Sequence, residues 1–430
     1  MKKLFLVLAV LALPAMLFAT GGQQQPASGG STGGYLRFAW WGNATRDERT
    51  QNVINLFVQK NPGVSIEPQI GTFGGGYWDV LAAQAASRDL PDVIQQDVSY
   101  IVRYADQLAD LKPFADRGLI DLSKWPPASL GNGTINNRMV GLLLGINALN
   151  FGVDPAVIAK AGVSFDDTKW SWADYEKIST QIFQQTGVQT YPAYQIRHII
   201  ESLCLQTNSS LFTADGKQMG IAVSQQAYNA LRNYLEMELR LMAAGVLYDP
   251  DDAFIAGRAM AEEPLERGKT WNMVFWNNQI EAHMAASNRP LESKMIPSIA
   301  GNSSPGMYLR SSMYVSMAEN STNKDLAARF INFLLNDLEA NRILLGERGI
   351  PVPTDVKADL YPRVSPGTQY AFDYIDRITP FASSGTNYPA NAGEVETMLQ
   401  NVTQRILTGR TTLDAGLQEM VRESNAILAR

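Results

Sequence analysis

Stretches typical of β-strands alternate with stretches typical of helices from residue 35 onward, and this alternation constrains the fold more than any other feature. An aromatic and apolar run at 35–41 predicts a buried strand. A helix is expected next, because Val53, Ile54 and Phe57 are spaced to share one apolar face. Asn61-Pro62-Gly63 then marks the end of that helix.

The same order of elements repeats along the next thirty or so residues. An alternating strand is predicted at 64–67, a second helix at 77–87 and a third strand at 92–94. Strands separated by helices in this way are typical of parallel βαβ units. The sequence therefore predicts an α/β protein with a doubly wound sheet, and 430 residues are enough for roughly two to three domains.

Composition limits the classes of function. Acidic residues outnumber basic ones 42 to 36, which excludes nucleic-acid binding that is dominated by electrostatic attraction. The chain has two histidines and one cysteine, too few for a His/Cys zinc site, and Cys204 alone cannot form an intrachain disulfide. We expect no nucleic-acid partner, no metal and no cofactor.

The first nineteen residues have the pattern of an export signal. Lys2 and Lys3 precede an apolar run at 4–18, and a small residue, Ala19, follows. The run is too short for a comfortable membrane span, so we predict a signal peptide at 1–19, with an uncleaved anchor as the alternative.

Residues 20–34 are mostly Gly, Gln, Ser, Thr, Ala and Pro, and we predict a flexible linker there. Thr20 stands where a lipid-anchored precursor would carry cysteine. We therefore expect a free protein in the periplasm or outside the cell envelope.

The residues that follow the predicted strands favour a sugar site. Ligands of open α/β sheets lie outside the carboxyl ends of the strands. Indole rings can stack on the C–H faces of a pyranose, while amides and carboxylates pair with hydroxyl groups. The residues at these ends are Trp40, Trp41, Asn43, Gln95, Gln96, Asp97, Tyr100, Asn147, Asn150, Trp276, Asn277 and Asn278.

Structural roles are open for several of these residues. Trp40 and Trp41 are adjacent, so in a strand they point to opposite faces and only one is expected to reach a ligand. Asp97, Asn277 and Asn278 could instead cap the helices that follow them. The isolated His198 and His283 are interpreted as structural histidines.

Several segments resemble extracellular solute-binding proteins of bacterial ABC sugar importers, the class of the maltose-binding protein. The resemblance runs from about residue 35 to the C-terminus. It rests on Ala39-Trp40-Trp41-Gly42, Phe57–Gly63, Pro91-Asp92-Val93, Gly152-Val153-Asp154, Lys169–Tyr175, Leu211–Lys217, Ala327–Leu335, Gly346–Pro351 and Leu407–Asp414. The motif order is specific, although each motif alone is modest.

This resemblance implies a type II periplasmic binding fold, in which two α/β lobes are joined by hinge strands and enclose a ligand cleft. By analogy, the chain crosses between lobes near residues 147, 295 and 336. Lobe one would then comprise 35–146 and 296–336, and lobe two 147–295 and 337–430.

The resemblance also implies roles for particular residues. Ligand contacts would come from Trp41, Asn43, Asp97, Tyr100, Asn147, Trp276, Ser311 and Ser312. Trp276 would be the stacking platform of lobe two. An acidic glycan would require cations in the cleft, for which Arg46, Arg197 and Arg310 are available.

The function implied is that of a non-enzymatic, monomeric carbohydrate receptor that closes on its ligand and docks on ABC permease subunits in the inner membrane. A secreted glycan-cleaving enzyme is one alternative, since Asp251-Asp252 and Glu262-Glu263 leave a carboxylate pair open. A chemosensory module, or a receptor of the same fold for a non-sugar ligand, is another.

Overall fold

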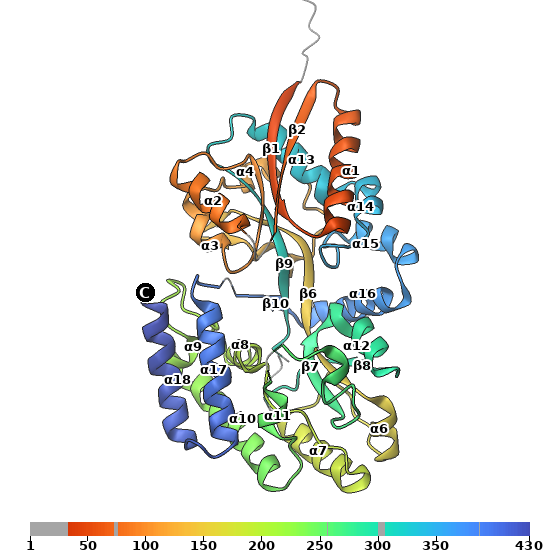
Figure 1. Ribbon diagram of the computed structural model, residues 1–430, viewed down its shortest axis with the longest axis vertical. Coiled ribbons are helices and arrows are strands. Elements are labelled where there is room, and N and C mark those ends of the chain that lie inside the picture. Colours follow the sequence, from red (N-terminus) through yellow and green to blue (C-terminus); the bar gives the residue numbers. More distant parts are fainter. Residues whose placement is uncertain (1–32, 73–75, 256, 300–305, 387) are drawn as a thin grey trace, which may run out of the picture.

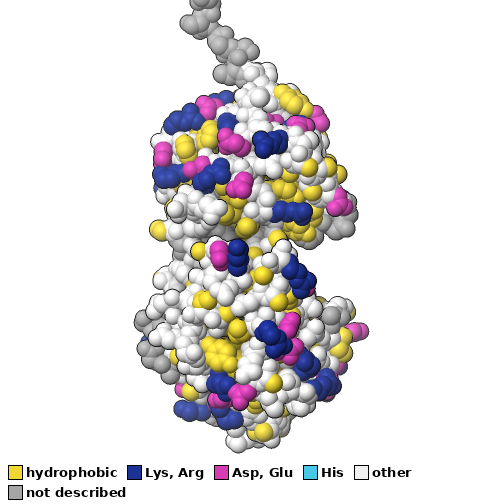
Figure 2. Space-filling view, turned by 90° about the vertical axis from the view of Figure 1, so that its left-hand side faces the viewer, with side chains coloured by type: hydrophobic (Ala, Val, Ile, Leu, Met, Phe, Trp, Pro, Cys, Tyr) yellow, Lys and Arg dark blue, Asp and Glu magenta, His cyan; other side chains and the backbone are white. Residues whose placement is uncertain are grey.

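The computed structural model describes residues 33–72, 76–255, 257–299, 306–386 and 388–430. It is an α/β structure of two lobes, one above the other in Figure 1, with long strands running between them. A constriction separates the two lobes in the space-filling view (Figure 2). The predicted signal peptide and nearly all of the predicted linker lie outside the described residues.

Lobe one is built on three parallel strands, as the strand–helix alternation predicts. β1 (Gly34–Trp41) pairs in parallel with β2 (Val64–Gly71) and with β3 (Val93–Gln96). α1 (Ala44–Lys60) connects β1 to β2 and buries Thr50, Val53, Ile54 and Phe57 on one face. The apolar spacing read from the sequence thus corresponds to the buried face of α1.

Two long strands belong to both lobes. β9 (Tyr308–Met317) is antiparallel to β3 in lobe one, and β6 (Leu142–Val153) is antiparallel to β9. Beyond their shared segment, β6 pairs with β7 (Asn272–Trp276) and β8 (Glu292–Lys294) in lobe two. The sheet order is β2-β1-β3-β9-β6-β7, and the short β10 (Ser383–Ser384) lies beside β9.

Helices cover the sheet in both lobes (Figure 1). The longer helices of lobe one are α1, α2 (Tyr77–Ala86), α13 (Lys324–Asn336) and α14 (Leu338–Leu344). Those of lobe two are α7 (Trp172–Thr186), α8 (Ile196–Gln206), α10 (Gln225–Ala243), α12 (Ile280–Ser287), α17 (Ala392–Leu407) and α18 (Leu413–Leu428). No described helix is both long and apolar enough to span a membrane.

Local packing indicates where to place the crossings between the lobes, which are predicted near residues 147, 295 and 336. The Ser298 N–H still donates to the Trp170 carbonyl of lobe two at 3.0 Å, so the crossing expected near 295 falls instead within β9. α14 packs on α1, and α15 (Thr354–Leu360) packs on α14, whereas α16 (Pro366–Ile378) packs on α12. We therefore propose one crossing in β6, which contains the predicted position 147, one in β9 in place of 295, and one between α15 and α16 in place of 336.

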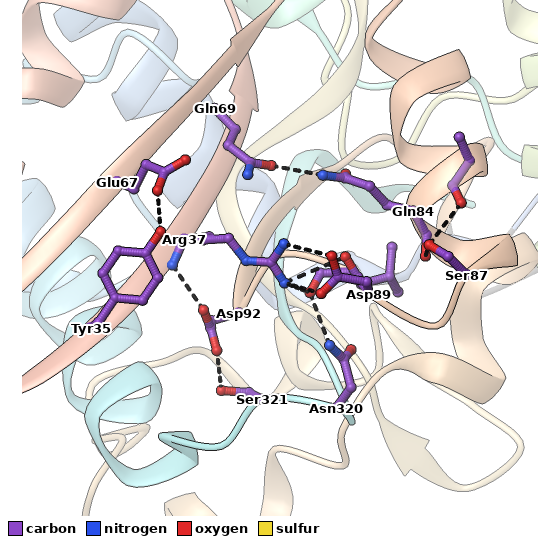
Figure 3. Close-up of polar contacts among 12 residues, drawn as sticks. Tyr35, Arg37, Glu67, Gln69, Gln84, Ser87, Asp89, Asp92, Asn320 and Ser321 are labelled. Atoms are coloured by element: carbon purple, nitrogen blue, oxygen red, sulfur yellow. Dashed lines mark hydrogen bonds and ion pairs between the residues drawn. The ribbon is translucent and has the colours of Figure 1, made fainter. Parts of the chain in front are cut away.

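A polar network joins the strands of lobe one at the end that lies away from lobe two (Figure 3). The Asp92 carboxylate accepts the Arg37 backbone N–H at 2.8 Å and the Ser321 hydroxyl at 2.6 Å. The Arg37 guanidinium in turn donates to Asp89 at 2.7 Å. Asp92, in the Pro91-Asp92-Val93 motif, therefore ties β1 and β3 to the chain after β9.

Candidate functional site

Strand register places the ends of several strands at the junction of the lobes. β9 runs from lobe two into lobe one, and its Tyr314 pairs with Gln96 at the carboxyl end of β3. β6 runs the other way, and its Leu149, close to the crossing, pairs with Trp276 at the end of β7. The carboxyl ends of β3 and β7 thus lie on the sides of their lobes that are nearest the crossing strands.

An aromatic group lies at this end of lobe one. The Trp41 ring centroid is 5.3 Å from that of Tyr77 and 5.2 Å from that of Trp78. Tyr100 stacks on Trp78 with 3.8 Å between centroids and 4° between planes. Tyr100 is half-buried and so presents part of its ring beyond the core. Such rings can pack against the C–H face of a sugar.

Trp40, the other indole at this strand end, belongs to the core. It has no exposed surface, its ring lies 5.0 Å from Phe38, and its Nε1–H donates to Asp47 at 2.9 Å. Because Trp41 retains 6% of its surface, it is the one of the adjacent pair that is nearer to solvent. We therefore drop Trp40 from the proposed ligand contacts.

Several predicted polar contacts hold local structure. Asn43 is the N-cap of α1 and accepts the Arg46 N–H at 3.0 Å. Asp97 accepts the Ser99 N–H at 2.8 Å. In β9, the Ser311 hydroxyl donates to the Met313 carbonyl at 2.8 Å. Each of these side chains would have to exchange or share a bond to meet a ligand.

The two asparagines after β7 differ in their surroundings. Asn277 is fully buried, where its Oδ1 accepts the Ala148 N–H at 2.8 Å and its Nδ2 donates to the Ala371 carbonyl at 3.3 Å. Asn278 is exposed. Asn277 therefore fixes the turn after β7, whereas only Asn278 has its side chain in solvent.

Trp276 lies within a cluster of aromatic and basic side chains in lobe two. The Arg310 guanidinium carbon lies 4.8 Å from the Trp276 ring centroid and 5.0 Å from that of Tyr388. His198 meets Trp276 edge to face at 4.8 Å and bonds to the Tyr308 hydroxyl at 3.1 Å. A cation over the face of an indole is attracted by its π-electrons. A sugar ring could therefore stack on Trp276 only from the face opposite Arg310.

Most charges around this cluster are paired. Arg197 is buried, forms an ion pair with Glu396 at 3.0 Å, and lies over Tyr388 at 4.4 Å. Glu201 accepts the Tyr388 hydroxyl at 2.7 Å and the Thr386 N–H at 3.0 Å.

The imidazole of His198 is kept neutral. Burial, together with the nearby charges of Arg197 and Arg310, lowers the pKa of His198 well below its usual value. His198 is thus a buried histidine held by Tyr308 and aromatic contacts, as its isolation in the sequence predicts. His283, also buried, bonds to Glu266 at 2.6 Å.

A chain of hydrogen bonds links the crossing strands to Trp41. The Ser312 hydroxyl of β9 donates to the Arg348 carbonyl. The Arg348 Nε–H donates to Gln95 Oε1 at 2.8 Å, and Gln95 Nε2 donates to the Trp41 carbonyl at 3.1 Å. Ser312 therefore fixes the junction of the lobes.

Close backbone approach at the crossing requires two glycines. A Cβ on Gly145 would lie 2.7 Å from the Arg348 carbonyl oxygen. Gly349 has φ +114°, a conformation that favours glycine, and a Cβ there would lie 2.9 Å from Ser312 Oγ. The β6 register also shifts at Gly145.

The amides of β6 carry unused hydrogen-bonding capacity. Asn147 pairs across the strands with Arg310, and its buried Oδ1 has no hydrogen-bond partner among the residues that the structure describes. Asn150 is fully buried and neither its Oδ1 nor its Nδ2 has one. Asn147 lies on the same face of the sheet as Arg310 and Trp276, because Leu149, two residues on, pairs with Trp276.

The sequence did not identify Tyr308 or Tyr388 as candidate site residues. It offered Arg310 as a cation but did not place it in the cleft. Tyr388 is 112 positions from Trp276 and follows a two-residue strand, so nothing local marks it. For Arg310, the only sequence signal is a charge within an otherwise apolar and hydroxyl-bearing strand. Within the described ranges, no three His, Cys, Asp or Glu side chains are grouped to hold a metal ion.

A protein-family model matches most of the chain. Residues 52–366 match the family described as bacterial extracellular solute-binding protein.

Solved structures share the fold over almost the whole chain. An extracellular solute-binding protein family 1 from Alicyclobacillus acidocaldarius is 24% identical, with TM-score 0.80, over 93% of this chain and 99% of that one. A periplasmic oligogalacturonide binding protein from Yersinia enterocolitica is 20% identical, with TM-score 0.79, over 92% and 99%. A cyclic alpha-maltosyl-1,6-maltose binding protein from Arthrobacter globiformis is 18% identical, with TM-score 0.68, over 92% and 99%.

Two designed esterases are also similar in fold, at 18% and 20% identity. At such identities the likeness concerns the fold alone and carries nothing about catalysis in this chain.

Proposed function

Because the chain belongs to the bacterial extracellular solute-binding proteins, we propose that it is the substrate-binding component of an ABC importer for a mono- or oligosaccharide. One observation carries the choice of ligand. Aromatic side chains stand at strand ends on both lobes, Trp41 and Tyr100 on one side of the junction and Trp276 on the other. The sugar ligands named for two proteins of the same fold support it.

Binding would proceed by closure of the lobes. A ligand can shift the equilibrium toward a closed form only if it binds that form better than the open one. A saccharide held by rings and amides of both lobes gains its full set of contacts only when they approach. The crossing strands β6 and β9, with glycines at 145 and 349, would accommodate the change in angle.

The protein would act outside the inner membrane and deliver its ligand to the permease subunits of the importer. The predicted signal peptide at 1–19, and Thr20 in place of a lipid-bearing cysteine, support a free periplasmic protein. A monomer suits this role, because each closed molecule must diffuse and dock. We propose no catalytic step, in keeping with the binding role of the family.

Calorimetric titration of residues 20–430 with mono- and oligosaccharides tests this function. We expect Trp276→Ala to abolish most binding and to leave the circular dichroism spectrum unchanged. Tyr361→Ala, which removes a partly exposed ring at the end of α15, is the matched control and should bind normally. Near-native affinity of Trp276→Ala would refute the site. Sugar cleavage on prolonged incubation would favour the enzyme alternative, and binding of peptides or polyamines alone would change the ligand class.

A further inference from the structure

We propose that the bound saccharide carries a carboxylate, and that Arg310 recognises it. This inference rests on the proposed function and adds the chemical class of the ligand. Arg310 lies on β9, directly across from Asn147 of β6, at the point where both strands pass between the lobes. Its position on the face of the sheet that it shares with Trp276 places a positive charge beside the proposed stacking ring.

The Arg310 guanidinium is held in place by two rings. Its central carbon lies 4.8 Å from the Trp276 ring centroid and 5.0 Å from that of Tyr388. Tyr388 is itself fixed, because its hydroxyl donates to the buried Glu201 at 2.7 Å. A planar guanidinium that packs its face against aromatic rings leaves its edge uncovered. The N–H groups at that edge can then point at a planar anion.

The charge of Arg310 has no partner among the described residues. Of the two arginines beside Tyr388, the buried Arg197 has its ion pair with Glu396, whereas the side chain of the half-buried Arg310 makes no ion pair and no hydrogen bond in the described part of the chain. The Glu201 carboxylate already accepts hydrogen bonds from the Tyr388 hydroxyl and from the Thr386 N–H. His198 is neutral and offers no opposing charge.

The Arg310 Nε–H is buried and has no acceptor within the described ranges, which points to a missing acceptor. A buried donor without an acceptor costs free energy, more so when the group is charged. A carboxylate accepts two parallel N–H bonds from a guanidinium and would satisfy both the donor and the charge. A neutral hydroxyl would satisfy only the donor.

Asn147 provides a neighbouring contact suited to the rest of a sugar ring. Its buried Oδ1 lacks a donor and lies across the strand pair from Arg310. A uronic acid presents a hydroxyl group and a carboxylate on the same ring. A donor for Asn147 and an acceptor for Arg310 could therefore come from one residue of the glycan, and a neighbouring residue of the glycan could stack on the free face of Trp276.

Matched pairs of glycans test this assignment. Calorimetry would compare oligomers of galacturonate, glucuronate and mannuronate with neutral counterparts that carry a hydroxymethyl group in place of the carboxylate. The variants would be Arg310→Gln, which removes the charge, and Arg310→Lys, which keeps it but loses the two-pronged geometry. Arg103→Gln, at an exposed arginine of α3 (Ile101–Tyr104) in lobe one, is the control.

We expect the unmodified protein to prefer an acidic glycan over its neutral partner and to lose affinity for it as salt is raised. Arg310→Gln should lose at least about 30-fold in affinity for the acidic glycan, with Arg310→Lys in between. Binding of neutral glycans should change little, and both variants should keep the native melting temperature within a few degrees.

Three results would overturn the assignment. Preference for neutral glycans would refute it while leaving the proposed function intact. Equal binding of an acidic glycan by Arg310→Gln would also refute it, and would place the carboxylate elsewhere. Failure of every saccharide to bind, with binding of an acidic dipeptide such as Asp-Glu, would refute both the assignment and the proposed function.

Discussion

Replacing Glu238 by glutamine should stabilise the protein at neutral pH. Glu238 lies on α10 and is fully buried in lobe two. Its Oε1 accepts the Tyr234 hydroxyl at 3.1 Å and its Oε2 accepts the Ala193 N–H at 3.2 Å, but no basic side chain among the described residues pairs with it. Burial raises the pKa of Glu238 from 4.5 to about 8.

The sign of the effect follows from proton binding. Between these two pKa values the unfolded chain has released the proton of Glu238, whereas the folded protein still holds it. Stability therefore falls as pH rises through this range, by up to about 1.4 kcal/mol per pH unit. The stability is fully present below the unfolded pKa and its loss is complete above the folded one.

The magnitude can be worked out for the glutamine variant, whose amide mimics the protonated acid and can serve both partners. At pH 7 the unmodified protein should be less stable than Glu238→Gln by about 3 kcal/mol, and at pH 5 by about 1 kcal/mol. Urea unfolding at the two pH values measures the difference. Glu236→Gln, at a more exposed position of the same helix, is the matched control and should show little pH dependence. Parallel stability curves for Glu238→Gln and the unmodified protein would refute the reasoning.

Three further predictions concern local structure. Asp154→Ala should lower the free energy of unfolding by about 1–2 kcal/mol in urea, because Asp154 caps the helix at 155–160 through two N–H groups and pairs with Arg289; an unchanged midpoint would contradict this. Gly349→Ala should destabilise by more than about 1 kcal/mol, while Gly393→Ala, where a Cβ meets nothing, should not; thermal melts compare them. Cys204 should resist alkylation until the protein unfolds, because burial raises the pKa of its thiol to about 12; rapid labelling of the native protein would contradict it.

The local parts of the fold were predictable from sequence because short-range patterns determine them. The helix expected at 77–87 is α2, and the three predicted strands form the parallel part of the lobe-one sheet. Apolar periodicity and Pro-Gly breaks suffice for such units, since each buries one face against its neighbours in the chain.

The crossing strands are longer than the apolar runs that mark them in the sequence. The apolar runs at 141–146 and 313–317 mark only parts of β6 and β9, which extend over Leu142–Val153 and Tyr308–Met317. The polar Asn147 and Arg310 interrupt the apolar pattern because these strands leave one lobe and enter the other. The later position that we propose for the third crossing could not be read from the sequence, since packing of α14 on α1 is a contact between residues almost 300 positions apart.

The candidate site could be predicted only in outline. The expectation that ligands lie at the carboxyl ends of strands identified Trp41, Tyr100 and Trp276 as candidates. It could not distinguish a ligand contact from a structural role, such as the capping by Asn43 or the turn fixed by Asn277. Tyr388 is brought to Trp276 by tertiary folding alone. Which of these side chains touch a ligand stays a prediction.

The central claim, that a saccharide draws the two lobes together, is tested most directly by small-angle X-ray scattering. Residues 20–430 would be measured alone and with the saccharide that binds most tightly in calorimetry, with Trp276→Ala in parallel. We predict a smaller radius of gyration for the unmodified protein with saccharide and no change for the variant. Saturating saccharide that leaves the scattering profile of the unmodified protein unchanged would contradict it.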